Sequence, residues 1–189
     1  LSEHDLSGAN LSDTFLLRTN LSGIDLRSIP LTNADFRYSD LSGTKLSDSL
    51  LVNNHFEHAT LSNIDFTGKN LSGSSFNQIK LDGSDMQDTD LSKALFIQVD
   101  FTKIKNKSLA GADLSYASFA HSNLSGVNLD DVTLDGTNLQ YADLTDQDFT
   151  NTKIIGVNDF YRAKLSNANF EDIHFISGKK SMFFENKAY

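Results

Sequence analysis

Histidines and carboxylates are the side chains in this sequence whose types and spacing could do chemistry. Imidazole and carboxylate groups gathered in one patch can bind a metal ion or transfer protons. His55 and His58 lie three residues apart. Aspartates also recur at multiples of twenty residues, in a series that Lys45 interrupts: Asp5, Asp25, Asp65 and Asp85.

Neither pattern matches a known kind of site. The five histidines (4, 55, 58, 121 and 174) fit no metal-ligand motif, and the sequence has no Cys. We expect His55 and His58 to point outward and the aspartates to form solvated surface. The sequence also lacks a Gly-rich phosphate loop, a nucleophile elbow and a candidate triad. It therefore predicts no catalytic residue, no metal and no cofactor; an enzyme acting on a carbohydrate or small ligand is the weaker alternative.

A short basic segment stands out in an otherwise acidic chain. The stretch "TKIKNKS" (102–108) places three lysines beside one apolar residue: Lys103, Lys105 and Lys107, with Ile104 between the first two. A solvated surface loop would explain it. A contact with a partner would explain it too, because loops on rigid scaffolds often carry function.

The positions of apolar residues indicate how the chain must hold these side chains. In steps of five from Leu1 to Phe101, all 21 positions are apolar: fourteen Leu, six Phe and Met86. An α-helix repeats every 3.6 residues and a strand every 2, so neither would gather these residues on one side. The pattern predicts a chain that turns a corner every five residues.

The residues around each apolar centre follow a consensus close to A-[D/N]-L-S-G. Close matches are "ANLSD", "ADFRY", "ADLSY", "ADLTD" and "ANFED". This pattern resembles the pentapeptide-repeat family over about residues 1–175. The resemblance implies an all-β fold, a right-handed quadrilateral parallel β-helix of about nine coils, with four five-residue units in each coil. Residues 176–189 would form a C-terminal tail and a candidate capping helix.

Twenty-residue coils would stack residues of one kind into internal columns. One column contains Leu16, Phe36, Phe56, Phe76 and Phe96, and we call the side of the coil built around it the Phe face. The register breaks after Phe101 and resumes at Leu109, three residues late. A three-residue insertion in the loop at 102–108 would return Phe119 to the Phe face, whereas taking Ile104 as a centre would not, so we favour the insertion. One more residue before Phe160 would place it there also.

The outward residues of the Phe face depart from the Ser, Gly and Asp of the consensus. We expect a partner-binding surface there, because Arg and Tyr often anchor protein interfaces and exposed apolar groups accompany them. A face that merely tolerates larger residues is the alternative. The predicted contact residues are Leu17, Arg18, Arg37, Tyr38, His58, Ile97, His121, Tyr141, Tyr161 and Arg162, and Phe15, His55 and Leu95 map to the same exterior.

Charge and hydropathy limit the partners. The net charge of -9 disfavours direct binding to nucleic acid, and no apolar run approaches the length of a membrane span. We therefore predict a non-catalytic module that binds another protein. It would be the docking or spacing domain of a larger bacterial protein, such as a secreted effector, since the chain starts at a repeat position without Met.

The resemblance implies an alternative function. Some members of the family are acidic rods that mimic DNA, bind the topoisomerase DNA gyrase and protect it from quinolones. We expect the protein in the bacterial cytoplasm, or in a host cell if it belongs to a delivered effector. The sequence leaves open which protein it binds and whether it is a monomer or a dimer.

Overall fold

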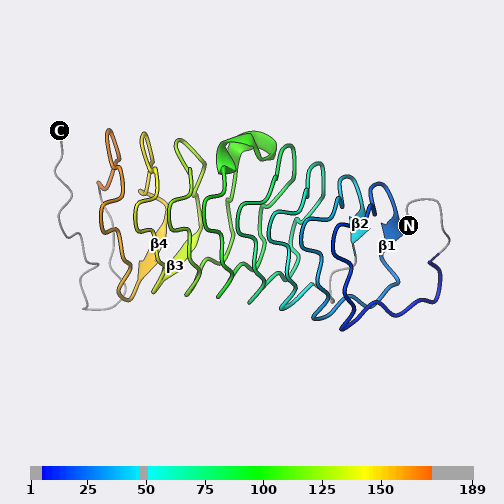
Figure 1. Ribbon diagram of the computed structural model, residues 1–189. Helices are drawn as coiled ribbons and strands as arrows, with labels where there is room; N and C mark the ends of the chain where they lie inside the picture. The colour runs from blue at the N-terminus through cyan, green and yellow to red at the C-terminus, as the bar shows by residue number, and fades with distance from the viewer. Residues whose placement is uncertain (1–5, 47–50, 172–189) are drawn as a thin grey trace.

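The computed structural model describes residues 6–46 and 51–171, which form a rod of stacked coils (Figure 1). Its regular elements are short. They are the strands β1 (Asp25–Leu26), β2 (Lys45–Leu46), β3 (Thr133–Asp135) and β4 (Lys153–Ile155), and the 3-10 helices η1 (Phe101–Lys103) and η2 (Lys105–Lys107). The predicted tail at 176–189 and the predicted domain end at 175 lie outside the described residues.

Parallel pairing joins each coil to the next. Strand β1 pairs with β2, and β3 with β4, in both cases with partners twenty residues apart. Isolated parallel bridges continue the same twenty-residue register along the rod, as in Phe15 with Asp35 and His55 with Ser75. The spacing widens to 23 residues where Asp90 meets Asp113 and to 21 where Asn138 meets Asp159. The chain therefore closes one four-sided coil about every twenty residues, as the sequence predicts.

Each corner is a tight turn that the consensus residues stabilise. In one such unit the Ala34 N–H donates to the Leu31 carbonyl, and Asn33 between them has a φ of 56°. This is the type II turn, which needs a residue with positive φ in its third place. The Asp of the consensus accepts from the residue two places on: Asp40 Oδ1 takes the Ser42 N–H at 2.9 Å and its hydroxyl at 2.6 Å. The recurring Asp/Asn and Ser/Thr positions are thus explained by local hydrogen bonds.

Stacked rings form the centre of the core. The ring centroids of Phe36, Phe56, Phe76, Phe96 and Phe119 follow one another at 5.2, 5.1, 4.6 and 5.1 Å. All five side chains are fully buried. The predicted internal column is therefore present, and it continues across the register break as the insertion requires.

The residue two places before each centre also points inward, and where it is Ser or Thr its hydroxyl often bonds to the adjacent coil. Ser74 donates to the Leu51 carbonyl at 2.8 Å and accepts the Asn54 N–H at 3.1 Å. Ile104 occupies an inward position of this kind and is only 4% exposed. This corrects the expectation that Ile104 is presented beside the lysines: the apolar residue anchors the loop, and the extra residues follow it.

Among the residues that the structure describes there is no α-helix, and none of their helices could cross a membrane.

Candidate protein interface

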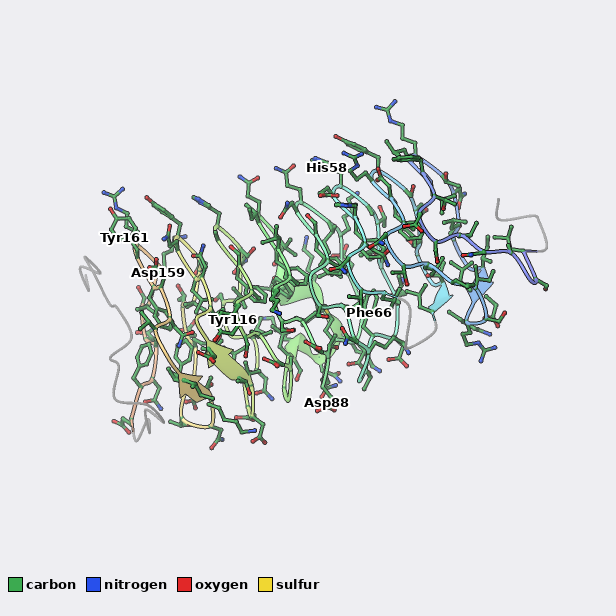
Figure 2. All side chains as sticks on the ribbon, turned by 90° about the horizontal axis from the view of Figure 1, so that it is seen from below. His58, Phe66, Asp88, Tyr116, Asp159 and Tyr161 are labelled. Atoms are coloured by element: carbon green, nitrogen blue, oxygen red, sulfur yellow. The ribbon has the colours of Figure 1, made fainter. Side chains whose placement is uncertain are left out.

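The predicted contact residues lie along one side of the rod. None of the ten is buried, and Ile97 and Tyr161 are the two that are half-buried rather than exposed. In Figure 2, His58 and Tyr161 occupy one long edge of the rod and Asp88 the opposite edge. The repeat geometry thus brings together side chains that are as much as 145 positions apart in sequence, from Leu17 to Arg162.

Eight of the outward side chains form a continuous row at the corner that follows the Phe face. We call this row the corner ladder, and all its members are exposed: Arg18, Tyr38, His58, Gln78, Gln98, His121, Tyr141 and Arg162. Every one has a φ between 54° and 62°. This left-handed conformation costs a non-glycine residue free energy. The other corners place glycine at many of the equivalent positions, as at Gly43 and Gly73, where no side chain projects.

Planar groups in the corner ladder contact their neighbours along the rod. Tyr38 stacks on His58 with ring centroids 4.6 Å apart, and His121 stacks on Tyr141 at 4.7 Å. The guanidinium of Arg18 lies 5.6 Å from the Tyr38 ring centroid, a cation–π distance. At the other end, Arg162 lies 5.9 Å from the Tyr141 ring and 5.2 Å from the Tyr161 ring. These contacts between neighbours favour one arrangement of the exposed groups in the free protein.

Two central members of the ladder were not among the predicted contact residues. Gln78 donates from Nε2 to Oε1 of Gln98 at 2.5 Å and so joins the two halves of the row. The predicted surface was defined by Arg, Tyr, His and apolar side chains, so it did not include these two amides. The twenty-residue column position alone could have revealed both residues.

Exposed apolar groups flank the ladder at one end of the described rod and near its middle. Phe15 is 82% exposed, and Leu17 and Leu95 are each 42% exposed. Burying such side chains against a partner would be favourable by about 25 cal/mol for each Å² removed from water. This side of the rod therefore combines apolar, aromatic and cationic groups.

Arg37 is held in place by an ion pair with a buried carboxylate. Its Nε and Nη2 donate to the two carboxylate oxygens of Asp35 at 2.9 and 2.6 Å. The side-chain hydrogen bonds from Arg37 hold the pKa of Asp35 below its ordinary value, against the opposing effect of burial. The guanidinium is thus oriented while almost half of the Arg37 side chain remains exposed.

The ion pair between Arg37 and Asp35 should affect the pH at which the protein unfolds in acid. A carboxylate with a lowered folded-state pKa stabilises the fold above its unfolded pKa near 3.9, and that stabilisation is lost as the pH falls through the lower folded value. In Arg37→Met, we expect the pKa of Asp35 to rise, so acid unfolding should begin at a higher pH than in wild type. Circular dichroism during an acid titration measures it.

Arg27 provides the matched control. Its ion pair with Asp25 has similar geometry but lies in solvent, although the pKa of Asp25 falls to about 2 through its hydrogen bonds with Arg27. Since water and salt screen an exposed pair, Arg27→Met should move the acid midpoint less. An equal or larger shift in the control would contradict the structural role of the Asp35 pair.

The lysine loop is at the next corner of the coil. Two of its three lysines form ion pairs within the chain, although more than half of each side chain remains exposed. Asp100 caps η1 by accepting from the Thr102 N–H, and Lys103 lies 3.7 Å from the same carboxylate. Lys105 pairs with Asp85 at 2.9 Å. Figure 1 shows the loop, in green, along the upper edge of the stacked coils. The loop and the ladder therefore lie at different corners, and the predicted loop contact remains a prediction.

Histidines and carboxylates do not assemble into a metal site in the described part of the chain, where no group of three such residues could hold an ion. His58 and His121 instead stack on tyrosines.

Comparison with known proteins agrees with the repeat geometry. A family model described as pentapeptide repeats matches the chain in eight copies, over residues 1–28, 31–68, 70–102, 100–131 and 128–158. No curated protein matches the sequence.

Solved structures of similar shape include two repeat proteins. One is HetL, a pentapeptide-repeat protein involved in the regulation of heterocyst differentiation in the cyanobacterium Nostoc; the match has 20% identity and a TM-score of 0.52, and it covers 85% of this chain and 89% of HetL. The other is a trypsin-treated variant of QnrB1, a plasmid-mediated fluoroquinolone resistance protein; this match has 15% identity and a TM-score of 0.55, and it covers 88% of this chain and 84% of QnrB1. At these identities the likeness concerns the fold, and the predicted right-handed quadrilateral β-helix is confirmed.

Proposed function

Because the chain belongs to the pentapeptide-repeat family, we propose that this rod is a non-catalytic module that binds another protein through the exterior of the Phe face. The observation that carries the proposal is the corner ladder, in which eight exposed side chains accept a costly left-handed backbone where a glycine would be free of strain. Exposed residues at such a corner contribute little to the core. A contact with a partner is a reason for them to be there.

The composition of this surface supports the same conclusion. Tyr and Arg are enriched at protein interfaces, and they contribute most when they are held rigidly before binding. Arg37 is fixed by Asp35, and Tyr38 is stacked on His58. A rigid solenoid with such a side suits the docking or spacing domain of a larger protein.

A paired substitution tests the proposal. We expect Arg37→Glu with Tyr38→Ala to reduce capture of bound proteins from a bacterial lysate by at least tenfold, because it reverses one charge on this surface and removes a stacked ring from the corner ladder. Quantitative mass spectrometry of immobilised wild-type and variant protein measures the loss.

Arg27→Glu with Tyr116→Ala is the matched control, since it makes the same changes at exposed residues on other sides of the rod. Proteins that bind the Phe face should still be captured by the control variant but not by the Arg37→Glu, Tyr38→Ala variant. If every captured protein bound the two variants equally, the interface would lie elsewhere.

The acidic net charge favours a second candidate function. With a charge of -9 on a rod, the protein could occupy a DNA-binding groove of a topoisomerase, in the manner that the family resemblance implies. A gyrase supercoiling assay separates the two functions. Inhibition or protection from a quinolone at about micromolar protein, unaffected by the paired Phe-face substitution, would favour charge mimicry.

A further inference from the structure

The residue types of the corner ladder follow the same order from either end of the rod. From the first described coils to the last its order is Arg18, Tyr38, His58, Gln78, Gln98, His121, Tyr141 and Arg162. The midpoint falls between the two glutamines that hydrogen-bond to each other. At about 4.8 Å per coil the row spans about 34 Å, with identical side chains at equal distances from the midpoint. The order of residue types in the ladder is therefore symmetric about this midpoint.

The repeat itself does not produce this symmetry. At the next corner, the equivalent residues show no such order: Gly23, Gly43, Asn63, Gly83, Lys103, Gly126, Asp146 and Asn167. The row of outward residues beside the ladder is also asymmetric, beginning with Leu17 and ending with Tyr161. The symmetric order thus belongs to the corner ladder and needs its own explanation.

We propose that the partner of the corner ladder is a second copy of this chain, which lies antiparallel along it. This inference rests on the proposed function and identifies the partner of the same surface. A two-fold axis through the midpoint makes residue i of one copy contact residue j of the other and j contact i, as in any isologous interface. Here the order of the ladder also makes i and j the same residue type. Tyr38 then faces Tyr141 of the other copy, His58 faces His121, and Gln78 faces Gln98.

The chemistry of the inner six residues suits pairing of like with like. A phenol, a neutral imidazole and a primary amide each carry a hydrogen-bond donor and an acceptor, so each can bond to its own kind. The stacked rings are nearly parallel, at 11° for Tyr38 with His58 and 4° for His121 with Tyr141. Because the rings stack face to face along the rod, their edges, which carry the polar atoms, are not covered by the neighbouring ring and can meet a second copy at the same height.

Charge also favours this corner for the approach of two acidic rods. The ladder carries two arginines and no acid, whereas the corner diagonally across the coil carries Asp88 and Asp131. With a net charge of -9 on each copy, contact through an acidic corner would be repulsive. Two copies that meet at the ladder therefore bring together the corner with the least negative charge on each rod.

The two ends of the ladder add a requirement. Arginine has donors and no acceptor, so Arg18 facing Arg162 of the other copy cannot pair directly. An oxyanion shared between the guanidinium groups would satisfy both, since arginine binds phosphate through paired hydrogen bonds. The dimer should therefore be stabilised by phosphate beyond the effect of ionic strength.

Sedimentation equilibrium tests association. We expect the average mass to rise from 20.9 kDa toward twice that value as concentration increases, with a dissociation constant at least threefold lower in sodium phosphate than in sodium chloride at equal ionic strength. Tyr38→Glu with Tyr141→Glu should weaken the dimer at least tenfold, because two pairs of like charges then face each other. A chain that stays monomeric in both salts overturns the inference.

Disulfide cross-linking tests the register, since the sequence contains no Cys. Tyr38→Cys mixed with Tyr141→Cys should form cross-linked heterodimers under mild oxidation. Tyr38→Cys alone should not cross-link, because its two thiols would lie about 24 Å apart across the axis, far beyond the reach of a disulfide. Cross-linking of Tyr38→Cys with itself at the rate of the mixture overturns the antiparallel arrangement.

A second pair keeps the test valid if a tyrosine variant fails to fold. His58→Cys mixed with His121→Cys should behave in the same way, with circular dichroism confirming the fold of each chain. A monomeric protein that still loses its lysate partners in the Arg37→Glu, Tyr38→Ala variant would overturn self-association alone. If the Arg37→Glu, Tyr38→Ala variant kept both self-association and its lysate partners, the proposed surface would be overturned as well.

Discussion

Replacing Phe96 by alanine should lower the free energy of unfolding by about 4 kcal/mol, within the range of about 3–5 found when a buried Phe is truncated. The ring is fully buried. It stacks between Phe76 and Phe119 at 4.6 and 5.1 Å and meets Phe101 edge-on at 5.3 Å. Neighbouring coils are held apart by backbone pairing at both sides, so they cannot collapse into the space, and the cavity would persist.

Denaturant unfolding followed by circular dichroism measures the effect. In a solenoid each coil packs mainly on its neighbours, so a defect between coils also weakens the coupling of the two halves of the rod. We expect the single transition to broaden or divide in the variant, with a lower apparent m-value. The matched control is Phe15→Ala, where the ring is 82% exposed and the cost should stay within about 0.5 kcal/mol. Equal costs at the two positions would mean that the ring column is not the core.

The internal column could be predicted from the sequence because it depends on one-dimensional periodicity. A residue such as Phe76 recurs in its place every twenty positions, and parallel pairing converts that spacing into contact. The insertion after Phe101 could be placed for the same reason, since only three added residues return Phe119 to the column. The side of the rod on which Arg37 and Tyr38 lie followed from the same count.

What periodicity could not predict is how side chains meet at the corners. The burial of Ile104 depends on where the chain leaves the coil, and its apolar character beside three lysines gave a misleading signal of exposure. The bond between Gln78 and Gln98 depends on rotamers and on the left-handed backbone at both positions. Likewise, the sequence does not indicate that Arg37 pairs with Asp35, because a flexible guanidinium could reach other nearby acids.

The second irregularity of the rod, near residue 158, places a buried polar side chain next to an inserted residue. One additional residue enters the coil before Phe160, so Asn138 pairs with Asp159 at a spacing of 21. Asn158 is fully buried there. Its Oδ1 accepts the Thr137 N–H at 2.8 Å, and its Nδ2 donates to the carbonyls of Leu134 and Ile155 at 3.2 and 3.0 Å. One side chain thus satisfies three backbone groups. The bonds to Thr137 and Leu134 are those that Ser74 makes to its neighbouring coil in the regular repeat, and the bond to Ile155 is added here.

Asn158→Leu should therefore destabilise the protein by about 3 kcal/mol or more, although the new side chain is apolar and of similar volume. Leaving a buried backbone donor or acceptor unsatisfied costs about 1–3 kcal/mol, and three such groups lose their partner here. Thermal and denaturant unfolding measure the loss. Asn70→Leu is the control, because Asn70 is exposed and accepts only the Ser72 N–H at 2.9 Å, so its replacement should cost less than about 1 kcal/mol. A stable Asn158→Leu variant would contradict the view that these three hydrogen bonds, rather than apolar packing, stabilise the fold at this position.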